Sequence, residues 1–278
     1  MVPADGRPPV SGGHDKLDAQ HEQWQSTFQG NPDMYGTDPS EPGAYAAGLF
    51  AREQIRDLLE LGAGQGRDTL AFLRAGLTVT ALDYAASALN CLQQAATDAG
   101  LADRLTTVAH DVRQPLPLPG SGFDAVYSHM LFNMALTTTE LETLSSEVHR
   151  VLRPAGLHVY TVRHTGDAHY GAGTSHGDST FENGGFIVHF FDRALVDRLV
   201  TGFTLLDLSA FEEGSLPRRL WRITLRREDA PLAPPLVPRG TGAAQARRTT
   251  ATGARDSPGT AARPFGTTAS WHNAATVL

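Results

Sequence analysis

Cysteine is almost absent from this 278-residue sequence, which contains only Cys91. One cysteine cannot form a disulfide within the chain, so we expect a protein of the reducing cytoplasm. No apolar run approaches the ~20 residues that a membrane helix needs, which argues against a membrane protein. The first residues also lack a basic segment followed by an apolar one, so we expect no secretory signal.

Positive charge is scarce as well, because 23 basic side chains face 30 acidic ones and the formal net charge is −7. The deficit lies in the first 230 residues, whereas residues 231–278 carry five arginines and one aspartate. An acidic folded part without a basic stripe of interleaved aromatics argues against a nucleic-acid partner. We expect a small-molecule substrate instead, and a protein that is a monomer or a homodimer.

Composition separates the ends of the chain from its middle. Residues 1–14 are rich in glycine and proline, and residues 229–278 consist mainly of Ala, Thr, Pro, Gly and Arg. Both segments are predicted to be disordered. Residues 15–54 are predicted to form a helical N-terminal cap, with helices at about 16–28 and 43–54.

The main domain, residues 55–228, begins with a regular alternation of apolar strands and helices. Such alternation predicts a parallel sheet with helices on both faces. Thr139 and Glu142 have the spacing of a capping box at the start of one of these helices. The predicted strands are 55–61, 77–82, 105–109, 123–128 and 157–162, and the predicted helices are one that ends near 75, then 86–99 and 139–152.

The pattern changes after the fifth strand. Residues 163–190 are rich in glycine and histidine and are predicted to form a loop over the active site. Asp192 then caps a short helix, and strands at 203–211 and 220–226 are predicted to add an antiparallel hairpin. The predicted fold class is therefore α/β, doubly wound and mostly parallel, with helices on both faces and an antiparallel last strand.

Three glycines at positions 62, 64 and 66 follow Glu60 at the end of the first strand. Glycine lets the backbone turn sharply and approach a ligand, and parallel sheets bind ligands at the carboxyl ends of their strands. A dinucleotide fingerprint would place its third glycine at position 67, where the chain has Arg67. Glu60 suits a ligand with an ammonium and a sulfonium better than a diphosphate. A purely structural strand–helix turn is the alternative.

Two further acids stand at the ends of the next strands. Asp83 could accept hydrogen bonds from both hydroxyls of a ribose; it could also cap the following helix. Asp111, between His110 and Val112, could accept a hydrogen bond from an exocyclic amine. Alone it could equally be a turn residue, but one acid at each strand end strengthens the ligand interpretation.

Together these residues resemble the pattern of class I S-adenosylmethionine-dependent methyltransferases. The resemblance covers roughly residues 40–227 and is nearest the branch of tellurite-resistance and related small-molecule methyltransferases. It implies a seven-stranded sheet whose seventh strand is antiparallel. The segments that carry it are Glu60–Gly66, Asp83, Asp111, Phe123-Asp124-Ala125-Val126 and Leu152–Gly156.

The resemblance also implies the cofactor, S-adenosylmethionine, and the residues around it. Glu60 and the backbone of residues 62–64 would face the methionine part, Asp83 the ribose and Asp111 the adenine. Ser128 and His129 would line the side from which the methyl group leaves. The predicted cofactor-binding residues are Glu60, Gly62, Ala63, Gly64, Asp83, Tyr84, His110, Asp111, Val112 and Ser128.

Methyl transfer asks little of side chains, because the sulfonium already activates the methyl group. The protein has to hold the nucleophile in line and exclude water, and a base is needed only if the nucleophile must lose a proton. No catalytic triad is visible. The candidate catalytic residues are His129, His164, His189 and Tyr35.

Two other groups of polar residues are interpreted as structural or solvent-exposed rather than functional. The histidines and acids of residues 163–190 match no zinc spacing, so we expect no metal. Glu212-Glu213 and Arg218-Arg219 are interpreted as a solvated hairpin turn rather than a substrate contact.

The predicted function is transfer of the methyl group of S-adenosylmethionine to a small-molecule nucleophile by in-line displacement. The acceptor atom stays open among O, N, S and a metalloid. One alternative is a nicotinamide- or nucleotide-dependent oxidoreductase on a Rossmann-like sheet, against which the glycine spacing, Glu60 and the antiparallel ending count. The other is a non-catalytic S-adenosylmethionine-binding module, although all of the binding acids are present.

Overall fold

The computed structural model describes residues 12–31, 34, 36, 38–214 and 218–228, and its centre is a seven-stranded sheet. The strand order is β3-β2-β1-β4-β5-β10-β9; neighbours from β3 to β5 pair in parallel, and β10 is antiparallel to both β5 and β9. The predicted fold class is confirmed. The strands are β1 (Asp57–Leu61), β2 (Thr78–Asp83), β3 (Leu105–Ala109), β4 (Phe123–His129), β5 (Leu152–Arg163), β9 (Phe203–Glu213) and β10 (Arg218–Arg227).

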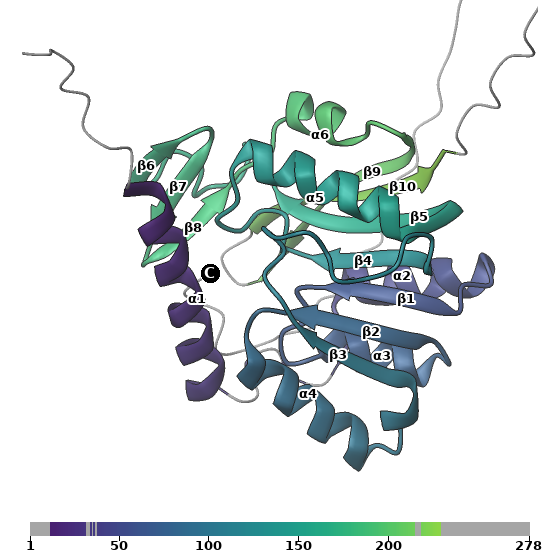
Figure 1. Cartoon of the computed structure of the whole chain (residues 1–278). Coiled ribbons are helices and arrows are strands. Elements are labelled where there is room, and N and C mark those ends of the chain that lie inside the picture. Colours follow the sequence, from purple (N-terminus) through teal and green to yellow (C-terminus); the bar gives the residue numbers. More distant parts are fainter. Residues whose placement is uncertain (1–11, 32–33, 35, 37, 215–217, 229–278) are drawn as a thin grey trace, which may run out of the picture. The chain divides into compact units, whose positions relative to one another are not determined.

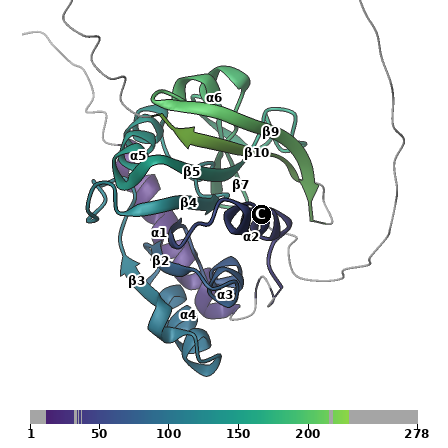
Figure 2. The same cartoon turned by 90° about the vertical axis from the view of Figure 1, so that its right-hand side faces the viewer.

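Helices cover both faces of this sheet, and each face has its own apolar core. Figure 2 shows α5 on one side of the strands and α2 and α3 on the other. One core joins the sheet to α5 and α6, and the other joins it to α2, α3 and α4. The helices are α1 (Gly12–Gly30), α2 (Glu41–Arg52), α3 (Arg67–Arg74), α4 (Ala86–Asp98), α5 (Thr138–Val151) and α6 (Arg193–Leu199), with a short 3₁₀ turn at Ala102–Arg104.

The N-terminal cap contains the two predicted helices. The first, α1, begins at Gly12, so the prediction that residues 12–14 are disordered is wrong. Each residue added to an existing helix gains a backbone hydrogen bond, which favours extension once the helix has formed. Residues 1–11 and the predicted tail after residue 228 lie outside the described residues. No helix among the described residues is long and apolar enough to span a membrane.

The capping box of α5 lies two residues earlier than predicted. Thr137 Oγ1 accepts from the Glu140 N–H at 3.2 Å, and Glu140 Oε2 accepts from the Thr137 N–H at 2.8 Å. The sequence offered two starts with the same spacing, Thr137 with Glu140 and Thr139 with Glu142. Asp178 decides between them, because its carboxylate accepts from the N–H and hydroxyl of Thr138.

The fifth strand also begins earlier than predicted. We expected Leu152–Gly156 to be a turn that separates α5 from the strand, but β5 begins at Leu152. The turn survives as an irregularity in the pairing with β4 between Phe123 and Ala125, and Ala155 has a φ of 61°. The chain therefore pairs with β4 on both sides of the irregular segment.

The predicted loop at 163–190 is wrong, since most of its second half is a small antiparallel sheet. Its strands are β6 (Thr174–Gly177), β7 (Thr180–Asn183) and β8 (Phe186–His189). Two-residue turns join them at Asp178-Ser179 and Gly184-Gly185, all with positive φ, which suits the twist of a hairpin. The Gly-Gly pair between apolar residues was the sequence signal for this hairpin.

The cap and the small sheet meet at the carboxyl edge of the large sheet (Figure 1). Trp24 and Phe28 of α1 pack with Phe186 of β8, with ring centroids 5.3 and 5.1 Å from Trp24. The side chain of Gln20 donates to the Gly185 carbonyl at 2.6 Å and accepts from the Ile187 N–H at 3.2 Å. Two segments that are far apart in the sequence therefore form one cover over this edge.

A buried hydrogen-bond network fixes the start of α2 to the sheet. Ser40 caps α2 by accepting from the Gly43 N–H at 2.9 Å. Asp68 of α3 accepts from the Ser40 N–H and hydroxyl, both at 2.7 Å, and from the Tyr127 hydroxyl at 2.8 Å. One carboxylate thus joins a loop, a helix and a central strand.

We predict that Tyr127→Phe lowers the free energy of unfolding by about 1–2 kcal/mol, because Asp68 loses a buried donor while the ring packing is retained. Urea denaturation followed by circular dichroism measures the change. Tyr170→Phe is the matched control, because Tyr170 is 41% exposed. Equal midpoints for Tyr127→Phe and the control would show that the network does not contribute.

Candidate active site

The glycine turn after β1 depends on glycine at two positions. Gly62 has a φ of 72° and its N–H donates to the Leu82 carbonyl at 2.8 Å. Gly66 has a φ of 86°, and a Cβ there would lie 2.2 Å from Leu92 of α4. Gly66, the residue just before α3, therefore has to be glycine because α4 packs directly against it.

Asp83 ties this turn to the end of β2. Its two carboxylate oxygens accept from the N–H groups of Gly64 and Ala85, each at 2.8 Å. Burial raises the pKa of Asp83, and these two hydrogen bonds act in the opposite direction. The N-cap of α4 is Ala85, so Asp83 does not occupy the cap position itself. A carboxylate has about four lone-pair sites, so both oxygens keep capacity for the predicted ribose contact.

Glu60 and Ser128 are two polar groups at this edge whose surroundings fit a bound cofactor. Glu60 is 3% exposed and accepts from the Thr69 hydroxyl at 2.5 Å. Burial, and then the nearby Asp68, raise the pKa of Glu60 well above its usual value. Ser128 is fully buried, and its hydroxyl has no hydrogen-bond partner among the described residues. An ammonium group placed here would supply what both side chains lack.

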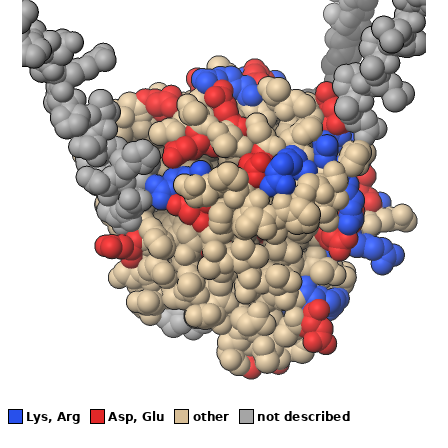
Figure 3. Space-filling view, viewed as in Figure 1, with Lys and Arg blue, Asp and Glu red and all other residues tan. Residues whose placement is uncertain are grey.

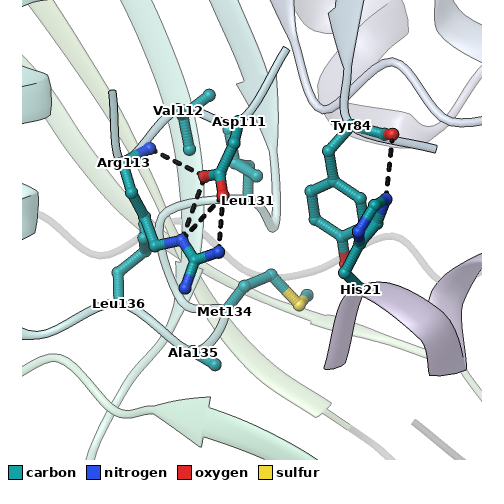
Figure 4. A pocket seen from close by; sticks show the side chains of 9 residues that line it. All are labelled: His21, Tyr84, Asp111, Val112, Arg113, Leu131, Met134, Ala135 and Leu136. Carbon is teal, nitrogen blue, oxygen red and sulfur yellow. Dashed lines mark hydrogen bonds and ion pairs between the residues drawn. The ribbon is translucent and has the colours of Figure 1, made fainter. Parts of the chain in front are cut away.

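Asp111 lies in a pocket but already has a partner, as Figure 4 shows. The Arg113 guanidinium donates to it at 2.5 and 2.8 Å, and the Arg113 N–H donates at 2.9 Å. Burial would raise the pKa of Asp111, but the hydrogen bonds from Arg113 outweigh it and the pKa is lowered. An adenine amine would have to share Asp111 with Arg113, so the turn interpretation is also supported.

A pocket lies beside Asp111. Val112 and Tyr84, both predicted to bind the cofactor, are among the residues that line it. His110 does not line it; this residue is half-buried, and its Nε2 lies 3.3 Å from the Gln114 carbonyl. The other lining residues, which the sequence analysis missed, are His21, Arg113, Leu131, Met134, Ala135 and Leu136.

Helix α1 covers the same region. The His21 ring contacts Tyr84 edge-on with centroids 4.7 Å apart, and the Gln65 amide donates to the Asn31 carbonyl at 2.9 Å. The Phe28 ring lies 3.3 Å from where a Cβ on Gly64 would be. The spacing of Trp24 and Phe28, four apart on a predicted helix, was the signal that one face of α1 is buried.

His129 is the candidate base that the structure places at the end of β4. Its Nδ1 lies 2.7 Å from Thr161 Oγ1, which also accepts from the Met130 N–H. Thr161 is fully buried, so its hydroxyl proton is best donated to Nδ1, and Nε2 then carries a proton towards Glu213 at 3.5 Å.

The other candidate bases have structural contacts. His189 is buried, and its Nδ1 lies 2.7 Å from the Leu136 carbonyl oxygen. Because a carbonyl oxygen can only accept, Nδ1 is the donor. His164 stacks on Trp221 with centroids 4.7 Å apart, and its Nδ1 accepts from the Gly166 N–H. A role for either as a base stays a prediction. Tyr35 lies outside the described residues.

The predicted solvated hairpin at the end of β9 and the start of β10 is only half correct. Glu212 and Arg219 are exposed and form an ion pair at 3.2 Å. Arg218 is 6% exposed, and Glu213 is turned inward beside His129, Arg67 and Arg218. Within the described part of the chain, no group of three His, Cys, Asp or Glu side chains could hold a metal ion.

Comparison with known proteins identifies the domain that carries this site. Residues 58–156 match a family model described as a methyltransferase domain. This segment of the chain is therefore similar to a methyltransferase domain. The match spans the glycine turn, Asp83, Asp111 and the end of β4, so the family motifs coincide with the carboxyl edge of the sheet. No curated protein matches this sequence.

Solved structures of methyltransferases share the fold of this chain. A Burkholderia thailandensis 1,6-didemethyltoxoflavin N1-methyltransferase, with bound 1,6-didemethyltoxoflavin and S-adenosylhomocysteine, is 21% identical, with a TM-score of 0.62, and the alignment covers 82% of this chain and 95% of that one. The CcbJ methyltransferase of Streptomyces caelestis is 18% identical (TM-score 0.56; 69% and 91% covered). The N-methyltransferase NodS of Bradyrhizobium japonicum, with S-adenosylhomocysteine, is 15% identical (TM-score 0.54; 77% and 99% covered).

We predict that Glu213 makes the free energy of unfolding depend on pH in the acid range. Burial would raise its pKa, but His129, Arg218 and Arg67 lower it to about 2. A carboxylate with a lowered pKa stabilises the fold above its unfolded pKa, and this contribution is lost as the pH falls through the folded value. The stability difference between the wild type and Glu213→Gln should therefore be full above about pH 4.5 and shrink towards pH 2.

Urea denaturation of both proteins at several pH values measures this difference. Glu212→Gln is the control, because Glu212 is exposed. A difference between wild type and Glu213→Gln that stays constant from neutral pH to pH 2 would contradict the assignment of the charged cluster.

Proposed function

We propose that this protein transfers the methyl group of S-adenosylmethionine to a small-molecule nucleophile. The observation that carries the proposal is the pair of buried polar side chains near the glycine turn: Glu60, and Ser128, whose hydroxyl has no hydrogen-bond partner among the residues that the structure describes. The methyltransferase-domain match supports the chemistry. A similar structure that holds both a small aromatic substrate and S-adenosylhomocysteine supports the substrate class.

The chain's residues would hold the cofactor in three places. Glu60, Ser128 and the backbone of the glycine turn would bind its methionine part, and Asp83 would bind the ribose hydroxyls. Tyr84, Met134 and the pair of Asp111 with Arg113 would enclose the adenine in the pocket of Figure 4. When bound, the cofactor supplies a methyl carbon that is activated for in-line displacement.

The remaining work of the protein is to position the acceptor and exclude water. Trp24, Phe28 and Phe186 provide an apolar cover for the edge, which keeps water from the reacting atoms. His129, at the end of β4, is the polar group best placed to orient an acceptor beside the leaving methyl group. No triad is needed, because the methyl group is already activated.

The proposal also covers the location, the oligomeric state and the kind of substrate of the enzyme. We keep the cytoplasm as its location, in agreement with the single free Cys91, and a monomer or homodimer as its state. On the face shown in Figure 3, basic and acidic side chains are intermingled, which supports a small molecule over a nucleic acid. The expected likeness to the tellurite-resistance branch stays a prediction that tests with tellurite as acceptor can decide.

Calorimetric titration with S-adenosylmethionine, S-adenosylhomocysteine and, separately, NADH tests the proposal. Micromolar binding of the first two and none of NADH is the expected result. Binding of NADH alone would support the oxidoreductase alternative. Binding of the cofactor without turnover of a broad panel of small nucleophiles would support the non-catalytic module.

We predict that Asp83→Ala weakens binding of S-adenosylhomocysteine by about 1–3 kcal/mol, roughly 5- to 150-fold, because the ribose and the Gly64 N–H both lose an acceptor. Asp103→Ala is the control, since Asp103 is exposed. Circular dichroism establishes that both variants are folded. Unchanged affinity in folded Asp83→Ala would remove Asp83 from the site.

A further inference from the structure

Arg218, the first residue of β10, has a buried cationic side chain. The residue is 6% exposed, its guanidinium makes no hydrogen bond with another described residue, and it has one ion pair among them, with Glu213 Oε2 at 4.0 Å. Burying a charge is costly unless it is paired and hydrogen-bonded. A buried guanidinium whose donors find no acceptor in the described part of the chain is therefore suited to bind an acceptor on a ligand.

Glu213 balances the charge of Arg218 without occupying its donors. Its Oε1 lies 3.5 Å from His129 Nε2 and 3.7 Å from Arg67, and its Oε2 lies 4.0 Å from Arg218. These distances exceed the 2.7–2.9 Å of a charge-assisted hydrogen bond.

The strand register places Arg218 at the same edge as the glycine turn. His129 pairs with Thr161 of β5, and Thr161 pairs with Arg222 of β10. Because alternate residues of a strand share a face, Arg218 lies on the same face as Arg222, and so on the face of His129. Arg67 directly follows Gly66, which brings the glycine turn to the same group of side chains.

We propose that Arg218, with the Nε2–H of His129, binds a carboxylate group of a ligand. The planar fork of a guanidinium matches a carboxylate with two parallel hydrogen bonds. The inference rests on the proposed methyl transfer and narrows its ligands. The carboxylate belongs either to the methyl acceptor or to the methionine part of the cofactor, and the experiment separates the two.

The test compares the wild type with Arg218→Gln, which removes the charge and the guanidinium fork and leaves a shorter, polar side chain. Arg219→Gln is the matched control, because the neighbouring Arg219 is 52% exposed. Calorimetry measures the affinity of each protein for S-adenosylhomocysteine and for decarboxylated S-adenosylmethionine. Benzoate and its uncharged counterpart benzamide are then titrated into each protein saturated with S-adenosylhomocysteine.

Two results support the carboxylate site and identify its source. If Arg218 holds the acceptor, benzoate but not benzamide binds the saturated wild type, and Arg218→Gln weakens benzoate binding by roughly tenfold or more without changing affinity for S-adenosylhomocysteine. If it holds the cofactor, Arg218→Gln weakens S-adenosylhomocysteine binding by a similar factor and leaves the decarboxylated cofactor unaffected.

Two results would overturn the inference. In the first, Arg218→Gln binds both S-adenosylhomocysteine and benzoate as tightly as the wild type does. In the second, the saturated wild type binds benzoate no better than benzamide, and Arg218→Gln keeps the affinity of the wild type for S-adenosylhomocysteine. Should Arg218→Gln fail to fold, Arg218→Lys, which keeps the charge and loses the fork, takes its place. A wild type that binds no S-adenosylhomocysteine would instead contradict the proposed function.

Discussion

The hydrogen bonds of Asp83 to the N–H groups of Gly64 and Ala85 fix the geometry on which the site depends. They join the turn after β1 to the end of β2, and the Gly62 N–H adds a backbone bond to the same strand. The turn sets the start of α3, and with it the places of Thr69 beside Glu60 and of Arg67 beside Glu213. The contacts of Glu60 and of Glu213 with α3 are therefore both positioned by one short turn.

The sheet and this turn could be predicted from the sequence because their signals are local. The parallel strands are apolar runs separated by helices, and acids and glycines stand directly at the strand ends, where the fold brings them together whatever the loops do. The position of Gly66 excluded a dinucleotide fingerprint, and the structure gives the physical reason, which is the approach of Leu92.

The contacts that could not be predicted join segments far apart in the sequence. Asp178, forty residues away in the sequence, binds Thr138 at the start of α5, so Thr137 and Thr139 could not be told apart as the cap from local spacing. Arg113 as the partner of Asp111 was missed because the interaction was expected with a ligand. Arg218 is buried because alternate residues of a strand share a face, and Leu220, two residues later, is fully buried on that face. The charge of Arg218 had led us to expect an exposed side chain.

Two glutamates at the carboxyl edge have pKa values shifted in opposite directions, and the contrast bears on the kind of ligand that the edge accepts. Burial raises the pKa of the buried Glu60 well above its usual value, and Arg67 offsets this only slightly. Glu213 is half-buried, and burial acts in the same direction there, but His129, Arg218 and Arg67 reverse the effect and lower its pKa to about 2. The surroundings of Glu60 therefore disfavour a carboxylate, whereas those of Glu213 favour one. A ligand with a positive centre near Glu60 and a negative group near Arg218 would suit both sides of the edge, because each would bring the opposite charge to its neighbour.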